Sequence, residues 1–223
     1  MDLITAVKER HSVRSYTDKK IESEKVKALK KVIDDCNERG DLHIQLVTNE
    51  PKAFDGFMAR YGNFSGVCNY VALIGKKSKD LQEKIGYYGA KIMLEVQTLG
   101  LNSCWVALTY KKVKTAFAVD KGEKLCGVIA IGYGATTGYP RKSKTFGEVA
   151  SCEASTVPEW YKNGVETALL APTAMNQQKF RFNLSADGKA EADTLGGFYT
   201  KTDLGIAKYF FNVGAGFDCF KED

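Results

Sequence analysis

The longest helical pattern in the chain runs from Asp80 to Leu99, and it requires a fold that contains one long helix with a single apolar face. Apolar residues that recur every three or four positions lie on one side of a helix. Gly100 follows at once and predicts the end of the helix, because glycine readily takes the left-handed conformation of a C-terminal cap. The residues of the apolar face are Leu81, Ile85, Tyr88, Ile92 and Val96.

Shorter helices and strands alternate irregularly over the rest of the chain. Helical spacing of apolar residues predicts further helices over residues 2–10, 22–37, 158–170 and 203–214. Apolar or alternating runs predict strands over residues 43–48, 69–75, 103–108, 126–133 and 179–184. Because helices and strands are mixed in this way, the chain is predicted to have an α+β fold.

Composition indicates a globular chain that contains a packed core. The 223 residues are enough for one sizeable domain or two small ones, and 44% of them are hydrophobic. No apolar run approaches the roughly 20 residues of a membrane span, so no membrane association is expected. The N-terminus shows no signal-type sequence. The six cysteines form no Cys-x-x-Cys pair, which favours reduced thiols in a cytoplasmic protein. With only His11 and His43 available, a structural zinc site is not expected.

The net charge of +5 is mild, and the lysines and arginines are spread along the chain. Nucleic-acid binding usually needs a denser basic stripe with stacking aromatic residues, so nucleic acid is not an expected partner. A local basic site for a phosphorylated small molecule agrees better with this pattern.

Arg10, Ser12 and Arg14 are the first candidates for such a site. Two guanidinium groups can bind a phosphate dianion, and the serine hydroxyl can donate a further hydrogen bond. The alternative is a helix C-terminus whose basic residues interact favourably with the helix dipole, and from spacing alone this alternative is the commoner. Residues 141–144, Arg-Lys-Ser-Lys, could close over the same phosphate or form a solvated basic loop.

Three further segments offer groups that could meet a ligand. Residues 171–178 combine a small-residue turn with amide side chains, which suits a polar ring edge or a ribityl chain. Residues 100–107 could present backbone N–H groups or form a buried turn and strand. The glycines of 132–138 do not have the spacing of a dinucleotide fingerprint, so we interpret them as a strand exit. Cys104 is not expected to be a nucleophile, because its surroundings are apolar and no histidine is near in sequence.

Together these segments resemble the FMN-dependent nitroreductase family. Residues 10–16 look like the family's Arg-x-Ser-x-Arg/Lys phosphate motif, and residues 100–105 like its Gly-Leu-Gly-Ser-Cys-Trp segment. Val128–Tyr133, with Lys142 and Lys144, resembles its last strand and the basic residues that hold the FMN phosphate. Residues 171–178 resemble its Ala-Pro-Ser-x-x-Asn-x-Gln-Pro-Trp motif. The resemblance implies one nitroreductase-like domain over residues 1–223, with a mixed central sheet flanked by helices.

The sequence departs from the family in the place of the Ala-Pro motif. In the family this motif follows the first long helix, where residues 35–40 of this chain show no match. Thr173 also replaces serine, and Lys179-Phe180 replaces Pro-Trp. In the family two identical chains intertwine, and each flavin lies at their interface. We therefore expect a single-chain pseudo-dimer whose halves, 1–150 and 151–223, complete one FMN site; the rival is a homodimer with two sites.

A weak internal repeat accompanies this hypothesis, since Tyr88–Lys91 resembles Leu204–Lys208. The resemblance implies a ping-pong reaction in which NADH or NADPH reduces FMN and a small acceptor, such as a nitroaromatic or quinone, reoxidises it. No side chain is expected to act as an acid or base. The expected FMN-binding residues are Arg10, His11, Ser12, Arg14, Trp105, Val106, Ala107, Lys142, Lys144, Pro172, Thr173, Ala174 and Asn176.

Two other classes of function stay open at this point. A non-catalytic flavin-binding or flavin-storage protein would hold FMN that NADH and NADPH cannot reduce. A basic binding module without flavin would remain colourless even after FMN is added.

Overall fold

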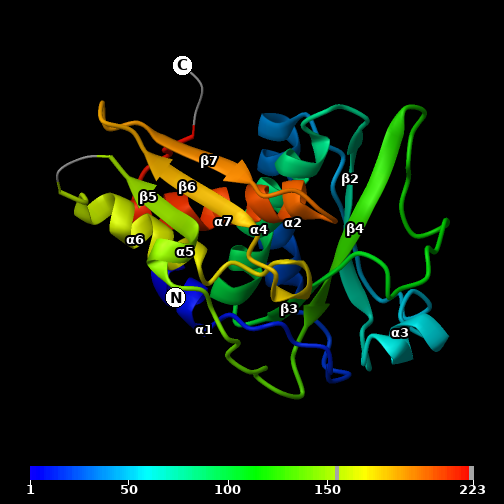
Figure 1. Cartoon of the computed structure of the whole chain (residues 1–223). Helices are drawn as coiled ribbons and strands as arrows, with labels where there is room; N and C mark the ends of the chain where they lie inside the picture. The colour runs from blue at the N-terminus through cyan, green and yellow to red at the C-terminus, as the bar shows by residue number, and fades with distance from the viewer. Residues whose placement is uncertain (154–155, 221–223) are drawn as a thin grey trace. The chain divides into compact units, whose positions relative to one another are not determined.

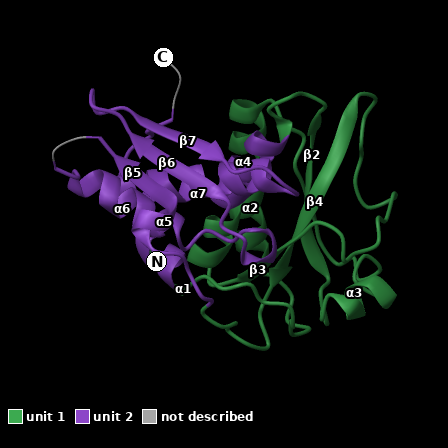
Figure 2. Ribbon diagram, in the orientation of Figure 1, with its two compact units in different colours: residues 1, 9–81, 92–140 green, residues 2–8, 82–91, 141–223 purple. Residues whose placement is uncertain are grey.

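Four antiparallel strands form the sheet of the first of two compact units (Figure 2). The computed structural model describes residues 1–153 and 156–220. The first unit comprises residues 1, 9–81 and 92–140, and the second unit comprises residues 2–8, 82–91 and 141–223. In the first sheet, β2 (Asn69–Lys76) and β4 (Glu123–Gly132) lie in the middle. β1 (Gln45–Val47) pairs with β2, and β3 (Asn102–Val106) pairs with β4.

The two inner strands are apolar over most of their length, and their central residues are buried. Continuous apolar runs of this kind are typical of strands in the interior of a sheet. α2 (Ser23–Gly40) packs against β1, and Asp41 caps it at φ 49°. The short helix α3 (Phe57–Tyr61) lies between β1 and β2 in the chain. An aromatic cluster around Phe54 completes the core, with ring centroids 5.1–6.2 Å from those of Phe64, Tyr70 and Tyr110.

The second unit has a smaller sheet of three strands. β6 (Phe180–Leu184) is central, parallel to β5 (Ala150–Cys152) and antiparallel to β7 (Ala190–Thr194). α7 (Thr200–Ala215) packs along α6 (Glu159–Ala168) and against β6 and β7 (Figure 1). α5 (Phe146–Val149) contacts β5 and β6, and α1 (Leu3–Glu9) belongs to this unit except for its last residue. Phe211 of α7 lies at the centre of the aromatic core, with ring-centroid distances of 4.7 Å to Phe182 and 5.6 Å to Tyr161.

Two glycines bring the backbones of α4 (Leu81–Thr98) and α7 into close contact within the second unit. A Cβ added to Gly86 would lie 2.1 Å from the Thr202 carbonyl oxygen, and one added to Gly205 would lie 2.0 Å from that of Glu83. The contact is reciprocal. Gly86 faces Thr202 and Ile206, which lie three residues before and one residue after Gly205. In the same way, Gly205 faces Glu83 and Tyr87, which lie three residues before and one residue after Gly86. The glycine of α4 that meets α7 in this way is therefore Gly86, whereas the sequence repeat aligns Gly89 with Gly205.

The α+β class, with sheets flanked by helices, is confirmed, and each predicted helix and strand corresponds to an observed one. The long helix is observed at Leu81–Thr98, and Gly100 follows it with φ 72°. The strands divide between two sheets: β1 to β4 pair antiparallel in the larger one, and β5 to β7 pair in both directions in the smaller one. Among the described residues, no helix combines the length and apolar character that crossing a membrane requires.

The sequence analysis did not predict the short elements α3, α5, β5 and β7, and it predicted only a turn where the 3-10 helix Ala174–Asn176 lies. β7 reads Ala-Glu-Ala-Asp-Thr, and all but the threonine are residue types depleted in strands. Its pairing with β6, from Phe180 opposite Thr194 to Leu184 opposite Ala190, decides its conformation. β5 has three residues, too few for an alternating pattern to be recognised.

Replacing Gly86 with alanine is expected to destabilise the protein by about 2–3 kcal/mol or more, because the new methyl group would overlap the Thr202 carbonyl and must push the helices apart. Thermal or urea unfolding of the full chain measures this change. The control is Gly147→Ala in α5, where an added Cβ meets no atom within 4 Å. Equal stability of the two variants would contradict the close helix contact.

Candidate functional site

The predicted phosphate motif lies just beyond α1, in an extended segment of the first unit. α1 ends at Glu9, so Arg10 to Tyr16 do not belong to the helix. Backbone hydrogen bonds hold this segment on both sides: Val13 N–H donates to the Ser103 carbonyl at 3.1 Å, and Tyr16 N–H donates to the Ser65 carbonyl at 3.0 Å. The segment therefore runs beside β3, which carries the second predicted motif, so the two motifs are adjacent.

Arg10, Ser12 and Arg14 share one neighbour, Cys104 of β3. Burial raises the pKa of the Cys104 thiol, while the charges of Arg14 and Arg10 and a hydrogen bond with the Ser12 side chain act in the opposite direction. The Arg10 side chain is buried, whereas Arg14 is exposed and its guanidinium lies 5.8 Å from the centroid of the Phe64 ring. Two positive charges and a hydroxyl thus lower the pKa of this thiol, but burial outweighs them and the raised pKa favours the protonated thiol.

The other predicted residues of the first unit lie on or beside β3. Trp105 and Val106 pair with Ile129 and Val128 of β4, and Ala107 follows directly after the strand. Ser103 is 1% exposed, and its hydroxyl has no hydrogen-bond partner among the described residues. Sequence reasoning missed this buried hydroxyl because its isolation depends on residues distant in the chain.

The glycine-rich segment after β4 packs against the phosphate motif. A Cβ added to Gly138 would lie 2.6 Å from the Cβ of His11, and Gly138 itself has φ 76°. Gly134 lies so close to Asn102 and Val13 that an added Cβ would be 2.7 Å from the Asn102 Oδ1 atom. These contacts agree with the interpretation of a strand exit, and they place the half-buried His11 next to this exit.

In the second unit, the basic segment 141–144 is bound to the Ala-Pro-Thr segment by a dense set of hydrogen bonds. Gln178 is the centre of this set and is 2% exposed. Its Oε1 atom accepts from Lys144 N–H at 2.8 Å, and its Nε2 group donates to Ser143 Oγ at 3.1 Å and to the Leu169 carbonyl at 2.8 Å. Lys144 Nζ also donates to the Gln178 carbonyl at 2.9 Å. The sequence analysis proposed both segments as candidates. The structure joins them through Gln178, which the sequence analysis did not single out.

The remaining contacts of this segment involve its predicted ligands. Asn176 Nδ2 donates to the Lys142 carbonyl at 2.7 Å, and the Thr173 hydroxyl accepts from Gln178 N–H at 3.1 Å. Arg141 donates to the carbonyls of Leu169 and Ala171. Pro172 is buried, Thr173 and Ala174 are half-buried, and Lys142 and Asn176 are exposed. Lys142 and Asn176 are thus joined by a hydrogen bond from the Asn176 amide to the Lys142 carbonyl, and both side chains remain exposed.

The turn itself adopts an unusual backbone. Met175, Asn176 and Gln178 have positive φ values of 50°, 55° and 44°, around a short 3-10 helix at Ala174–Asn176. Each non-glycine residue in this region costs about 1–2 kcal/mol, so surrounding contacts must hold the turn. One of these contacts comes from Asp203 of α7, whose Oδ1 atom accepts from Ala174 N–H at 2.9 Å. Asp203 lies far along the chain from the turn, and no sequence pattern pointed to it.

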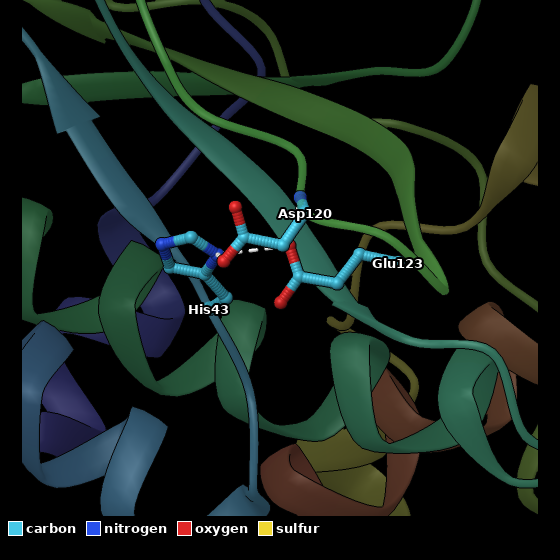
Figure 3. A group of neighbouring side chains, drawn as sticks. All are labelled: His43, Asp120 and Glu123. Atoms are coloured by element: carbon cyan, nitrogen blue, oxygen red, sulfur yellow. Dashed lines mark hydrogen bonds and ion pairs between the residues drawn. The ribbon is translucent and has the colours of Figure 1, made fainter.

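His43, Asp120 and Glu123 bring three ligand-type atoms within 4.8 Å of one another in the first unit (Figure 3). The hydrogen bonds of Gln45 determine which ring nitrogen of His43 carries a hydrogen. Its amide makes a two-point contact with Ala118, by accepting from N–H at 3.0 Å and donating to the carbonyl at 2.7 Å, so its Nε2 group must be the donor toward His43 Nε2, 3.1 Å away.

The Nδ1 atom of His43 therefore carries the hydrogen and donates a hydrogen bond to Glu123 Oε2 at 2.9 Å. A metal-bound histidine normally donates its other ring nitrogen to an acceptor, whereas the other nitrogen of His43 accepts from Gln45. The hydrogen bonds thus favour a contact that fastens β1 to residues 118–123 over a metal centre.

The family described as "Putative TM nitroreductase" matches residues 2–215. A "putative nitroreductase" from Thermotoga maritima has a TM-score of 0.66 and 20% identity, over 96% of this chain and 83% of that chain. A "putative nitroreductase in complex with FMN" from Desulfovibrio desulfuricans has a TM-score of 0.55 and 17% identity, over 71% of this chain and 99% of that chain.

A "Putative NADH dehydrogenase/NAD(P)H nitroreductase" from Bacteroides thetaiotaomicron has a TM-score of 0.51 and 19% identity, over 66% of this chain and 95% of that chain. At these identities the likeness shows the fold. No curated protein matches the chain. Because the family match extends over nearly the whole chain, the protein belongs to the nitroreductase family described as "Putative TM nitroreductase".

Proposed function

We propose that this chain is an FMN-dependent oxidoreductase that takes hydride from NADH or NADPH and passes the electrons to a nitroaromatic, a quinone or a similar small acceptor. The family supports a flavin oxidoreductase, and the related fold from Desulfovibrio desulfuricans contains FMN. The observation that carries the proposal is the backbone pairing of the Arg-x-Ser-x-Arg segment with β3, through the bridge of Ser12 to Ser103 and the hydrogen bond from Val13 N–H to the Ser103 carbonyl.

The first unit has groups that suit a phosphate. Arg10 and Arg14 supply two guanidinium groups, which bind phosphate oxygens through charge-assisted hydrogen bonds. The Ser12 and Ser103 hydroxyls lie on neighbouring paired segments, and that of Ser103 has no hydrogen-bond partner among the described residues. An extra polar ligand atom would satisfy such a buried hydroxyl. These residues therefore fit the phosphate end of FMN.

We assign the remaining predicted residues to the same FMN. Lys142 and Lys144 would add positive charge at the phosphate, with His11 beside the motif. Thr173 and Asn176, with Pro172 and Ala174, would meet the ring edge or the ribityl chain. A backbone N–H near Val106 or Ala107, next to Trp105, would face the flavin ring. This assignment is supported by the contacts within each set of residues. In the first unit β3 carries Trp105 and Val106, and in the second unit Gln178 binds Lys144.

Bound FMN would supply the hydride and electron transfer, and the protein's own residues would bind and orient it. The guanidinium groups would neutralise the phosphate, and the hydrogen-bonded turn at 173–178 would offer polar groups in a fixed arrangement. No side chain in either set has to exchange a proton with the acceptor. Positive charge near the ring would also favour its reduced, anionic form.

Purified protein loaded with FMN is expected to lose its flavin absorbance when NADH or NADPH is added without oxygen. Addition of a quinone or nitroaromatic should then restore the absorbance, because the acceptor reoxidises the flavin. Anaerobic absorption spectroscopy measures both steps. Bound FMN that neither nucleotide reduces would point to flavin storage, and failure to bind FMN at all would contradict the proposal.

Arg14→Ala is expected to weaken FMN binding about tenfold or more. A hydrogen bond to a charged group contributes about 1.5–3 kcal/mol, and about 1.4 kcal/mol corresponds to a factor of ten. Quenching of FMN fluorescence gives the dissociation constant. The matched control is Arg39→Ala, which removes an exposed arginine that pairs with Asp35 on α2. Unchanged affinity in a folded Arg14→Ala variant would exclude a role for Arg14 in binding FMN.

We further propose that the chain is a single-chain pseudo-dimer. A two-fold symmetric dimer contact is reciprocal, so that residue i meets j and residue j meets i. The Gly86–Gly205 contact has this property although both glycines belong to one chain. The two halves would then supply complementary FMN-binding sets, with the Arg-x-Ser-x-Arg motif in one and the Ala-Pro-Thr turn in the other.

The FMN-loaded protein is expected to have the mass of one chain, 24.6 kDa, and to contain one FMN. Light scattering coupled to size-exclusion chromatography gives the mass, and flavin absorbance gives the stoichiometry. A mass of two chains with two FMN molecules would favour the conventional homodimer instead.

A further inference from the structure

Asp203 is a buried carboxylate that the proposed chemistry does not use. It lies in the first turn of α7 and is 2% exposed. Both of its oxygens are engaged: Oδ1 accepts from Ala174 N–H at 2.9 Å, and Oδ2 accepts from Gln177 Nε2 at 2.6 Å. Burial raises the pKa of this carboxyl, while these two hydrogen bonds lower it. No lysine or arginine among the described residues pairs with it.

The two donors belong to the same turn, and the turn carries the predicted FMN-binding residues Thr173, Ala174 and Asn176. Ala174 is the first residue of the 3-10 helix, immediately before the two left-handed residues Met175 and Asn176. Accepting from the Ala174 backbone fixes the direction of the peptide group at the entry to this strained segment. The carboxylate therefore acts on the backbone that sets where Thr173 and Asn176 lie.

Gln177 extends the connection to the chain before α7. Its Nε2 group donates to the Phe198 carbonyl at 3.0 Å as well as to Asp203. One hydrogen of the Gln177 amide thus bonds to Asp203 at the start of α7, and the other bonds to Phe198 in the segment that precedes the helix. The turn is held at two points, Ala174 and Gln177, by one anionic side chain.

We propose that Asp203 is a positioning residue for flavin binding, which holds the 173–177 turn in the conformation that receives FMN. This inference rests on the proposed function. A carboxylate suits the task because it offers two acceptors and no donor, and both partners are donors. An asparagine in its place keeps one acceptor and turns an N–H group toward the Gln177 amide. An alanine removes both acceptors and leaves the Ala174 N–H without its partner.

The test compares Asp203→Asn and Asp203→Ala in the full chain with the matched control Asp193→Asn, an exposed aspartate on β7. FMN fluorescence quenching gives the affinity, and amide hydrogen exchange of Ala174 in the FMN-free protein gives the state of the turn. We expect Asp203→Ala to weaken FMN binding at least tenfold and to speed Ala174 exchange at least tenfold. Asp203→Asn should weaken binding about threefold and keep Ala174 protected, and the control should match the wild type.

A folded Asp203→Ala protein with unchanged Ala174 exchange, or with wild-type affinity for FMN, would overturn the inference. If Asp203→Ala does not fold, Gln177→Ala removes one of the two hydrogen bonds from a half-buried position and must itself weaken FMN binding for the inference to stand. Failure of the wild-type protein to bind FMN would reject the proposed function. Ala174 exchange would then still report whether Asp203 holds the turn.

Discussion

The backbone contact between α4 and α7 at Gly86 and Gly205 is the constraint on which the second unit depends. Glycine on both sides lets the helices approach so closely that side chains flanking the crossing also meet. Lys208 Nζ lies 2.5 Å from Glu83 Oε1, and Asn212 Nδ2 donates to the Tyr87 hydroxyl at 3.1 Å. Asp203 precedes Gly205 by only two residues. The position of α7 against α4 therefore also sets the position of the carboxylate that holds the 173–177 turn.

The two candidate binding sets are supported in different ways. In the first unit, backbone pairing with Ser103 of β3 places Ser12, and the Arg14 carbonyl accepts from Ser65 N–H, so their positions follow from backbone hydrogen bonds. In the second unit, two buried polar side chains, Gln178 and Asp203, hold an irregular turn. A sheet edge tolerates most changes of side chain, whereas a turn of this kind depends on specific hydrogen-bonding groups. Substitutions outside the predicted FMN-binding residues should consequently matter more in the second set than in the first.

Much of the fold follows from local patterns, and the site follows from them only in part. Apolar spacing was sufficient to find the helix at Leu81–Thr98, and continuous apolar runs were sufficient for β2 and β4. Spacing could not tell which glycine of the helix meets α7, because Gly86 and Gly89 are equally compatible with the pattern. The motif residues were recognisable by resemblance. Asp203 was not, because its role arises from a contact between segments that only tertiary packing brings together.

The sequence of β7 is poor in residues that favour strands, and this composition has a further consequence. The strand lies at the edge of the smaller sheet and reads Ala-Glu-Ala-Asp-Thr, so this edge strand carries two acidic side chains. An unpaired edge offers a row of backbone groups that can recruit a second chain, and charged residues discourage this. The composition that makes β7 hard to recognise as a strand is therefore also one that discourages edge-to-edge pairing with another chain.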